Sequence, residues 1–580
     1  MTRLIAFLKP YRKECIIGPI FKLLEAILEL LLPTLMALVI NHGVAQRDLP
    51  YVLKMGGLML FMALAGFGSS LICQYYAARA SQGFGTTLRN AMFEQINRLS
   101  YAEIDRFGTA SLINRITNDV NQLQLAVAML IRLVIRAPFI CAGALVMAMI
   151  LDIQLSLVLL AAAPIFAAIL YVIIRLASPL YRRYQEQLDR LGRLLGENLA
   201  GVRVIRAFAR TGAEQERFAT ANDDLTGTAL RVARISALLS PLTSLVMNAA
   251  IIAILWVGGI HINAGRLAQG EIIAFVNYIT QMLLALIVVS NLVILFTKAF
   301  ASAGRVEAVL AATPDIADPP SGRTAAPGPR PDAPFIEFDR VSFGYSRGGD
   351  QALTDISLVI RRGETVGVIG GTGSGKSTLV NLLPRFYEVT AGAIRIAGVD
   401  VRDYPLRRLR EQIGVVPQQA VLFSGTVAEN IRWGKSGASD AEVAEAARIA
   451  QADEFIARLP GGYDARVERG GRNFSGGQKQ RLTIARALVG RPAILILDDS
   501  ASALDFATDA ALRRAIKGAS GGTTVFLVSQ RASTIRQADR IIVLDDGRIV
   551  GQGSHQELLK QCQIYREICL SQLSQEEVGA

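Results

Sequence analysis

Cysteine is scarce in this chain, and it is not arranged for cross-linking or metal binding. The 580 residues include five cysteines, and no two of them form a CxxC pair. Three lie in apolar stretches and two lie near the C-terminus: Cys15, Cys73, Cys141, Cys562 and Cys569. Disulfide scaffolds and zinc sites need characteristic spacings. The distribution therefore argues against both and fits a reduced cytosolic side.

The sequence also lacks signs of a cleaved leader and of a nucleic-acid surface. Its N-terminus, MTRLIAFLKPYRKE, has no small-residue cleavage site before the first apolar stretch, so we expect no removable signal peptide. The net charge of +12 would suit nucleic acid, but many Lys and Arg residues flank apolar stretches, where membrane topology favours them. We therefore expect a lipid bilayer and no nucleic acid as a partner.

Apolar residues, in contrast, are abundant. They make up 51% of the chain, and the mean hydropathy is +0.36, values typical of a membrane protein. A helix needs about 20 apolar residues to cross a bilayer. Six stretches are long enough, and they lie near residues 15–40, 55–79, 126–150, 154–177, 235–262 and 271–297. They predict an α-helical membrane domain of six transmembrane helices.

The connections between these stretches predict the topology. Those after the first, third and fifth spans are short and nearly neutral, whereas those after the second and fourth are long and rich in Arg. The positive-inside rule then places the long connections and both termini in the cytoplasm.

Both long connections are predicted to be helical. In residues 101–124 and 190–218, apolar residues recur at three- and four-residue spacing, which predicts helices that extend the spans into the cytoplasm. Such hairpins are either solvated without a partner or press on a soluble domain. Apolar side chains favour the second alternative: Ile113, Ile116, Val204, Ile205 and Phe208.

Seven prolines between residues 314 and 334 mark a domain boundary, since such a segment is extended and semi-rigid. We therefore divide the chain into a membrane domain (1–312), a linker (313–333) and a soluble domain (334–580). In the soluble domain, β-rich runs alternate with helical ones; these runs are 335–343, 364–370, 393–398, 493–499, 523–529 and 540–547. This alternation predicts an α/β fold with a largely parallel core sheet.

A phosphate-binding loop follows the strand ETVGVIG. The run GGTGSGKST matches the pattern G-x4-G-K-S, in which backbone N–H groups wrap the phosphates and the next helix begins with its positive end toward them. Lys376 is expected to reach the β- and γ-phosphates, and Ser377 to bind Mg²⁺. The expected nucleotide-binding residues of this loop are Gly370, Thr372, Gly373, Ser374, Gly375, Lys376, Ser377 and Thr378. Downstream, Asp498 follows the apolar run AILIL and supplies a second Mg²⁺ ligand.

A third motif, NFSGGQKQ, resembles the signature of ATP-binding-cassette (ABC) proteins; its residues are Ser475, Gly476, Gly477 and Gln478. The resemblance implies that this motif caps the γ-phosphate of ATP held by an opposite domain. It further implies that Tyr345 stacks on adenine, and that Gln418 is a third Mg²⁺ residue that joins the metal site to the membrane domain. Asp505, which ends the run SALD, is implied to lie in a loop that crosses the dimer interface.

Taken together with the six spans, nearly the whole chain resembles a bacterial half-transporter of the multidrug-exporter type. The resemblance implies an ABC ATPase domain behind the membrane domain, ATP and Mg²⁺ as cofactors, and two chains that pair to form two ATP sites. It also implies residence in the bacterial cytoplasmic (inner) membrane. We expect export of a small, amphipathic or lipophilic molecule. The alternatives are import of a metal chelate or similar solute, and a nucleotide-gated channel or regulator.

Two positions depart from the family pattern. The family usually has Glu where this chain has Asp499, and His where it has Gln530. A carboxylate withdrawn by about 1 Å can cost on the order of 100-fold in rate, and Gln cannot carry the charge of an imidazolium. One reading is neutral drift that leaves an adequate site. The other, which we favour, is a site that binds ATP but hydrolyses it poorly, and a heterodimer with a partner half-transporter that has Glu and His.

Charged and polar residues within the spans suggest a substrate pathway, because such residues usually face a cavity or a partner. Lys22, Glu25 and Glu29 share one face of the first span. They form either an acidic lining for cationic substrates or a local Lys–Glu pair plus a hydrogen bond between helices. In the last span, Asn277 and Gln281 belong to a polar stripe that is expected to face the pathway.

Overall fold

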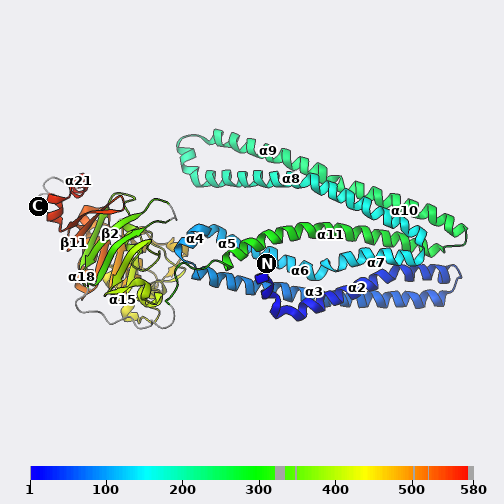
Figure 1. Ribbon diagram of the computed structural model, residues 1–580, viewed down its shortest axis with the longest axis horizontal. Coiled ribbons are helices and arrows are strands. Elements are labelled where there is room, and N and C mark those ends of the chain that lie inside the picture. The colour runs from blue at the N-terminus through cyan, green and yellow to red at the C-terminus, as the bar shows by residue number, and fades with distance from the viewer. Residues whose placement is uncertain (1, 320–333, 346–348, 501–502, 520, 573–580) are drawn as a thin grey trace. The chain divides into compact units, whose positions relative to one another are not determined.

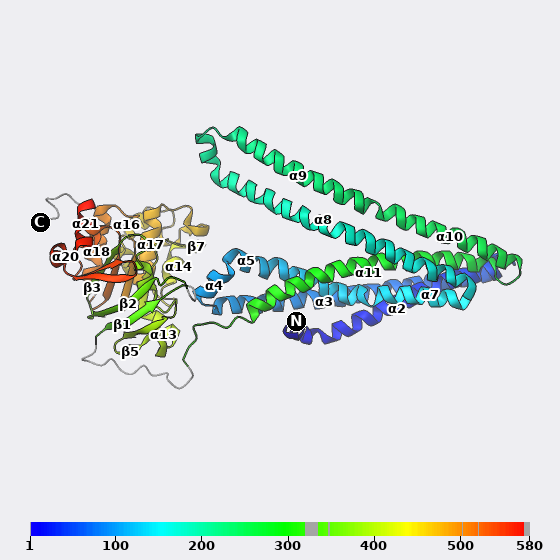
Figure 2. The same cartoon turned by 45° about the horizontal axis from the view of Figure 1, so that its top comes forward.

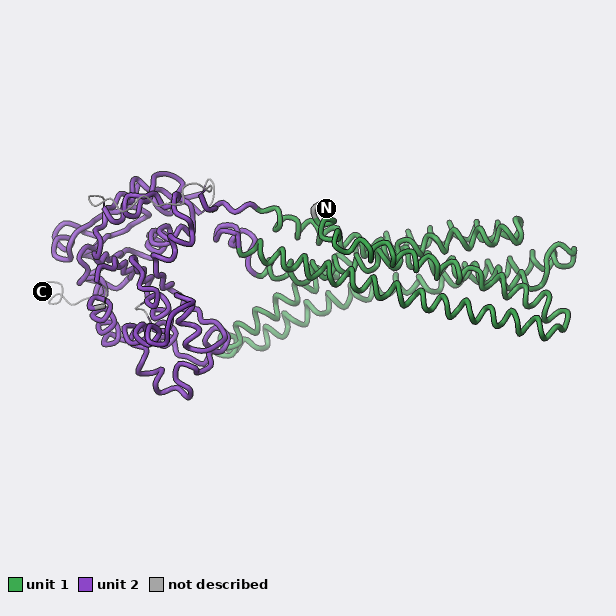
Figure 3. The backbone as a smooth tube through the Cα atoms, turned by 90° about the horizontal axis from the view of Figure 1, so that it is seen from below, with its two compact units in different colours: residues 1–97, 110–312 green, residues 98–109, 313–580 purple. Residues whose placement is uncertain are grey.

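The computed structural model describes the chain apart from residues 1, 320–333, 346–348, 501–502, 520 and 573–580. Most of the predicted linker therefore lies outside the described residues. The chain forms two compact units (Figure 3). The first comprises residues 1–97 and 110–312, and the second comprises residues 98–109 and 313–580. A short segment between the second and third spans thus belongs with the soluble domain.

The first unit is helical, and its helices confirm the six predicted spans. Six helices of the described chain are long and apolar enough to cross a membrane: Ala6–Val44, Leu49–Arg98, Thr109–Leu151, Ile153–Ala207, Thr211–Asn263 and Gln269–Leu310. Local π-type turns and a 3-10 turn divide some of them. The elements are α1 (Thr2–Ile5), η1 (Ala6–Tyr11), α2 (Arg12–Leu38), η2 (Val39–Val44), α3 (Leu49–Arg98), α5 (Thr109–Asn114), η3 (Arg115–Asp119), α6 (Val120–Met129), η4 (Leu130–Val134), α7 (Arg136–Leu151), α8 (Ile153–Ala207), α9 (Thr211–Ala237), α10 (Leu239–Asn263) and α11 (Gln269–Leu310).

Residues 190–218 form the helical hairpin that their periodicity predicts. Helices α8 and α9 lie side by side and diverge from α3 and α11 toward their turn (Figures 1 and 2). The side chains of Leu199 and Phe208 near this turn are 74% and 73% exposed, and Val204 is also exposed. We call these three residues the apolar tip.

Polar contacts between helices hold the first unit together. Buried Tyr278 of α11 donates a hydrogen bond to the carbonyl of Leu30 (2.9 Å), and its hydroxyl lies 2.6 Å from that of Thr34. Buried Asp119 accepts hydrogen bonds from Ser302 and Arg305 of α11. Each neutral bond contributes about 1 kcal/mol and each charged one about 2 kcal/mol, so these contacts fix α11 against α2 and η3.

The second unit contains the predicted parallel sheet. It has six strands in the order β12-β11-β3-β10-β9-β6, all parallel except β12. The strands β3, β9 and β10 are almost entirely buried, as expected for a parallel sheet covered on both faces. The sheet comprises β3 (Thr365–Gly370), β6 (Ile413–Val416), β9 (Ile494–Asp498), β10 (Thr524–Val528), β11 (Arg540–Asp545) and β12 (Arg548–Gly553).

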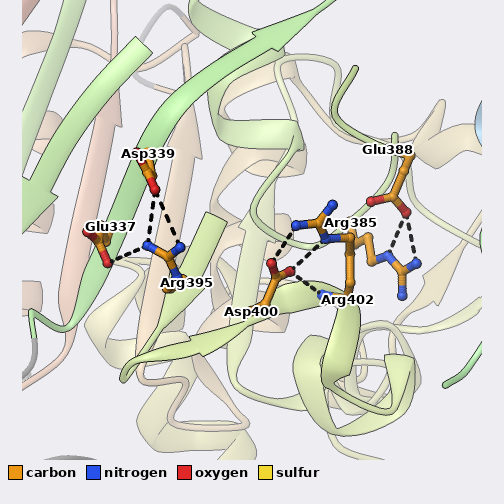
Figure 4. Close-up of polar contacts among 7 residues, drawn as sticks. All are labelled: Glu337, Asp339, Arg385, Glu388, Arg395, Asp400 and Arg402. Carbon is orange, nitrogen blue, oxygen red and sulfur yellow. Dashed lines mark hydrogen bonds and ion pairs between the residues drawn. The ribbon is translucent and has the colours of Figure 1, made fainter. Parts of the chain in front are cut away.

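An antiparallel sheet of four strands, in the order β2-β1-β4-β5, completes the β-structure together with a two-stranded ribbon. In Figure 4, Arg395 of β4 bonds Glu337 and Asp339 of β1, across the register that places Arg395 opposite Glu337. The strands are β1 (Ile336–Phe343), β2 (Leu353–Ile360), β4 (Ala391–Ile396) and β5 (Val399–Asp400), with β7 (Gly425–Thr426) and β8 (Arg466–Val467) in the ribbon.

Helices surround these sheets (Figure 1). One of them, α4 (Tyr101–Phe107), comes from the segment between the second and third spans. The others are α12 (Lys376–Asn381), α13 (Leu406–Glu411), α14 (Val427–Arg432), α15 (Asp440–Ile449), α16 (Asp453–Ala457), α17 (Gly476–Leu488), α18 (Phe506–Ala519), α19 (Ala532–Ile535), α20 (His555–Gln561) and α21 (Gln563–Gln572), with 3-10 turns η5 (Val401–Asp403), η6 (Gly462–Asp464) and η7 (Arg469–Gly471).

Candidate nucleotide site

The carboxyl ends of three neighbouring parallel strands bring the predicted nucleotide residues together. The phosphate loop follows β3, Asp498 ends β9, and Gln530 follows β10; β10 lies between the other two strands. Loops at this edge of an open parallel sheet commonly bind ligands. They enclose a cavity of about 340 Å³, lined by Tyr345, Ala352, Thr372, Gly373, Gly375, Lys376, Ser377, Thr378, Gln418, Asp498, Asp499, Val528, Ser529 and Gln530.

The phosphate loop requires glycine at two positions. A Cβ atom on Gly370 would lie 2.0 Å from the carbonyl oxygen of Leu544. Gly375 has φ +92°, in the left-handed region, and caps the start of α12. These glycines let the backbone turn tightly into the helix, so that its first N–H groups point toward the cavity.

The ammonium group of Lys376 is positioned to bind an anion in the cavity. Its ammonium group donates to the carbonyls of Gly370 (3.1 Å) and Gly371 (2.6 Å). Burial lowers the pKa of Lys376, and the nearby carboxylates of Asp498 and Asp499 oppose this shift. A phosphate group in the cavity would add negative charge beside this ammonium and stabilise its charged form.

The oxygen pair Ser377 and Asp498 fits Mg²⁺. The hydroxyl of Ser377 donates to the carboxylate of Asp498 at 2.9 Å. Burial raises the pKa of Asp498, while the bond from Ser377 and the charge of Lys376 oppose the rise. Hard oxygen ligands on a phosphate-binding loop are what Mg²⁺ prefers, and a divalent cation would offset the cost of a buried carboxylate.

Asp499 directly follows Asp498 and contacts Gln418. It lines the same cavity, has φ +45° and accepts a hydrogen bond from Gln418. Burial raises the pKa of Asp499, and the charge of Arg531 is the largest influence that lowers it. Gln418, which the resemblance linked to the metal, therefore contacts the carboxylate next to the metal ligand.

Gln530 also lines the cavity, and a side chain of helix α21 holds its backbone in place. The side-chain amide of Gln572 in α21 donates to the carbonyl of Gln530 (2.8 Å) and accepts from the N–H of Ala532 (2.9 Å). Sequence reasoning missed both the contact of Gln572 with Gln530 and the influence of Arg531 on Asp499. The one available signal was the basic residue directly after Gln530.

Tyr345 lines the cavity on the side expected for the base. Its ring is 55% exposed, and its hydroxyl lies 3.0 Å from that of Thr378 in α12. An exposed aromatic face that is held at one end offers a stacking surface to a purine.

The signature motif lies outside this cavity. Ser475 caps α17 by accepting from the N–H of Gln478, whose side chain bonds the N–H of Ser475 in return. A Cβ atom on Gly477 would lie 3.1 Å from the carbonyl of Ala503, so the signature lies beside the loop that ends at Asp505. Asp505 in turn accepts two hydrogen bonds from Thr508. Ser475 and Gly476 are exposed, so the positive end of α17 is available to a ligand from outside the chain.

In the membrane unit, both candidate carboxylates are paired. Lys22 bonds Glu25 (2.6 Å), and Arg136 of α7 bonds Glu29 (2.6 Å). These contacts match the alternative to an acidic lining, namely a local Lys–Glu pair plus a hydrogen bond between helices. Asn277 is exposed and bonds its own helix at the carbonyl of Ile273, and the side-chain oxygen of Gln281 is buried without a hydrogen-bond partner among the described residues.

Comparisons with known proteins agree with this geometry. A model of the ABC transporter transmembrane region matches residues 15–286, and a model of the ABC transporter family matches residues 353–502. The chain is 40% identical over 579 residues to an uncharacterised ABC transporter ATP-binding protein of Mycobacterium tuberculosis, which covers 99% of this chain and 98% of that protein. It is 36% identical over 514 residues to an ATP-dependent lipid A-core flippase of Syntrophus aciditrophicus, covering 87% and 84% respectively.

A solved structure is also similar. That of a bacterial Atm1-family ABC exporter with ATP bound matches with a TM-score of 0.80 and 27% identity, over 97% of this chain and 100% of that chain. Fold, nucleotide cavity and relatives thus agree, and the chain belongs to the ABC transporter family, as an exporter half-transporter with fused membrane and ATP-binding domains that uses ATP and Mg²⁺.

Proposed function

We propose that this chain is one half of a heterodimeric, ATP-driven exporter of small amphipathic or lipophilic molecules. Its own nucleotide site holds ATP and hydrolyses it poorly, and its signature motif completes the site of the partner chain. The observation that carries this proposal is a contrast within one nucleotide site. The phosphate loop and Mg²⁺ ligands are complete, whereas Asp499 and Gln530 stand at the positions that act on the attacking water and the γ-phosphate.

The contacts of Asp499 support slow hydrolysis. Its carboxylate accepts from Gln418 and lies in the field of Arg531 and Lys376. These interactions hold the Asp499 carboxylate against neighbouring side chains. They therefore oppose its contact with a water molecule that lies in line with the γ-phosphate. Asp is one methylene shorter than Glu, and a shortfall of about 1 Å lowers the rate on the order of 100-fold.

The exposed start of α17 supports a functional complex of two chains. Ser475 and the first N–H groups of α17 form a helix terminus that is suited to bind an anion. These residues do not belong to the lining of the nucleotide cavity in the described part of the chain. A γ-phosphate supplied by a second chain would complete this terminus. The apolar tip is a second surface that a second chain would cover, because exposed apolar side chains at one turn mark an interaction site.

In this mechanism, ATP binding draws the two ATP-binding domains together through the phosphate loop of one chain and the signature of the other. The long cytoplasmic helices transmit the movement to the spans, and hydrolysis at the partner's phosphate loop resets it. We place the protein in the bacterial cytoplasmic (inner) membrane with both termini in the cytoplasm, because the positive-inside rule assigns the Arg-rich connections to that side.

The substrate class rests on two observations. Ion pairs neutralise the carboxylates of Glu25 and Glu29 in the first span, so a pathway along this face of the helix suits a lipophilic molecule. The relative from Syntrophus acts on a lipid A-core molecule, as its name states. Neither importer nor channel activity is favoured by a particular contact.

The test is the ATPase activity of this chain purified alone in lipid nanodiscs, compared with the double variant Asp499→Glu/Gln530→His. We expect slow turnover by the native chain and at least about a tenfold increase in the double variant. Rapid turnover by the native chain alone would contradict the asymmetric site.

A further inference from the structure

A second cavity of the ATP-binding domain lies at the amino ends of strands β3 and β10. Its volume is about 310 Å³, at the lower end of the range that holds small ligands. Thr365, which begins β3, lines this cavity, whereas the phosphate loop starts at Gly370, the other end of the same strand. The strand spans about 16 Å between these two residues. The two cavities therefore occupy opposite edges of the parallel sheet and are separate sites.

One wall of this second cavity is apolar. Val525 and Leu527 of β10 line it, and they share one face of the strand because side chains alternate. Ile516 of α18 lines it as well, and all three side chains are buried. The wall thus offers a surface for the apolar part of a ligand.

The other side of the cavity is cationic. Helix α18 contributes Arg513, Arg514 and Lys517 to the lining. The lining contains one carboxylate, that of Asp539, so three cations and one anion leave a net charge of +2. Asp539 also accepts a hydrogen bond from the N–H of Thr365 at 2.8 Å, and this bond takes up part of its capacity to pair with a cation.

The cations of α18 are only partly compensated. Arg513 pairs with Asp509 at 3.0 Å, but its Nε atom is buried without a hydrogen-bond partner among the described residues. The Nε of Arg514 donates to the carbonyl of Ala510 in its own helix at 3.3 Å. In the part of the chain that the structure describes, the ammonium group of Lys517 has no hydrogen-bond or ion-pair partner.

This arrangement costs stability unless an anion is present. Lys517 follows Arg513 by four residues and Arg514 by three, and like charges at these spacings on a helix repel each other. The negative end of α18 favours cations in its last turn, but that effect does not require them to line one cavity. An anion in the cavity would relieve the repulsion between all three.

We propose that this cavity binds a small organic phosphate, with its phosphate group against α18 and its apolar part against β10. A phosphate dianion matches the net charge of the lining. The guanidinium of Arg514 presents paired donors that fit phosphate oxygens, and Lys517 adds a compact positive charge. The site does not depend on the γ-phosphate contacts or on pairing with a second chain.

Photolabelling of the full-length chain in phosphatidylcholine nanodiscs tests the proposal. The probe is 4-azidophenyl phosphate, and saturating Mg²⁺–AMP-PNP keeps it out of the nucleotide site. Mass spectrometry should find the label in peptides covering residues 509–517, 523–527 or 534–539. Labelling should saturate and should fall when unlabelled phenyl phosphate is added. The uncharged probe 4-azidophenol should label these peptides about tenfold less, because it lacks the charged hydrogen bonds.

Matched variants test the role of the cations. Arg514→Gln/Lys517→Gln should lower labelling about tenfold or more, and Lys517→Arg should retain it. Both side chains are exposed, so the double variant should fold, and binding of a fluorescent ATP analogue checks this. The control Arg548→Gln/Lys560→Gln removes the same charge from exposed residues of the same unit that do not line the cavity, and its labelling should equal that of the native chain.

Three results would overturn the proposal. The first is undiminished labelling of the cavity peptides in the folded double variant or with 4-azidophenol. The second is labelling spread equally over other basic peptides, which would show adsorption to the charged surface. The third is loss of labelling when phosphatidylglycerol replaces phosphatidylcholine, which would assign the cavity to an anionic lipid headgroup.

Discussion

The hydroxyl of Ser377 lies 2.9 Å from the carboxylate of Asp498, so two of the three expected Mg²⁺ residues already face each other at the end of β9. We expect Ser377→Ala and Asp498→Asn each to weaken Mg²⁺-dependent ATP binding about 10- to 100-fold, as loss of a metal-site partner usually does. Titration of a fluorescent ATP analogue with and without Mg²⁺ measures the difference. Ser357→Ala, on the antiparallel sheet, serves as the control and should bind normally.

Binding should also depend on pH. Burial raises the pKa of Asp498 above its ordinary value, and Mg²⁺ needs the ionised carboxylate. Mg²⁺-dependent affinity is therefore complete above the raised pKa and is lost as the pH falls through it. The same titration across a pH series detects this loss. Asp498→Asn removes the titrating group, and a pH profile identical to that of the native chain in this variant would contradict the assignment.

In the proposed heterodimer, the two ATP sites should respond differently to mutation. Ser475→Ala removes the cap of α17 and should lower the ATPase rate of the co-purified heterodimer about tenfold or more, whereas Asp499→Ala should change it little. Ser554→Ala is a matched control, because Ser554 caps α20 in the same way, by accepting from the N–H of Glu557. Equal losses from Ser475→Ala and Asp499→Ala would argue for two equivalent sites.

The pair formed by Glu29 and Arg136 should matter for stability more than for transport. Glu29→Gln leaves the guanidinium without its carboxylate and should destabilise the membrane domain by about 1–2 kcal/mol, a figure reduced because both side chains are partly exposed. The double variant Glu29→Gln/Arg136→Gln should recover part of this loss. Thermal unfolding in detergent measures the stability.

Dye transport tests the same pair for function. If the pair is structural, efflux of a cationic dye by the folded fraction of Glu29→Gln should remain close to that of the native complex. A specific loss of efflux with normal thermal stability would favour an acidic lining.

Local patterns were enough to predict which residues meet in the candidate nucleotide cavity. The phosphate loop, Asp498 and Gln530 each follow an apolar run, and parallel strands bring their carboxyl ends to one edge, so their meeting in one cavity follows from the alternation of strands and helices. The six spans were predictable for a similar reason, because length and composition alone identify them.

Contacts between distant parts of the chain were not predictable. The pairing of Glu29 with Arg136 joins residues 107 positions apart, and the bond from Gln572 to Gln530 joins helix α21 to the bend after β10. Strand β2 (Leu353–Ile360) was not among the predicted strands, because its charged and polar residues interrupt the apolar run and its burial alternates. The membership of α4 in the second unit likewise depends on aromatic contacts that no periodicity describes.

The apolar tip has a consequence for how a cell makes this protein. A copy without its partner carries Leu199, Val204 and Phe208 uncovered on a long helical hairpin. Chaperones and proteases act on such orphaned surfaces and keep the abundance of an unassembled subunit low. If the chain works in the proposed heterodimer, its steady-state amount is set by the supply of the partner chain, and synthesis of the two chains in equal numbers is a requirement that the exposed hairpin imposes.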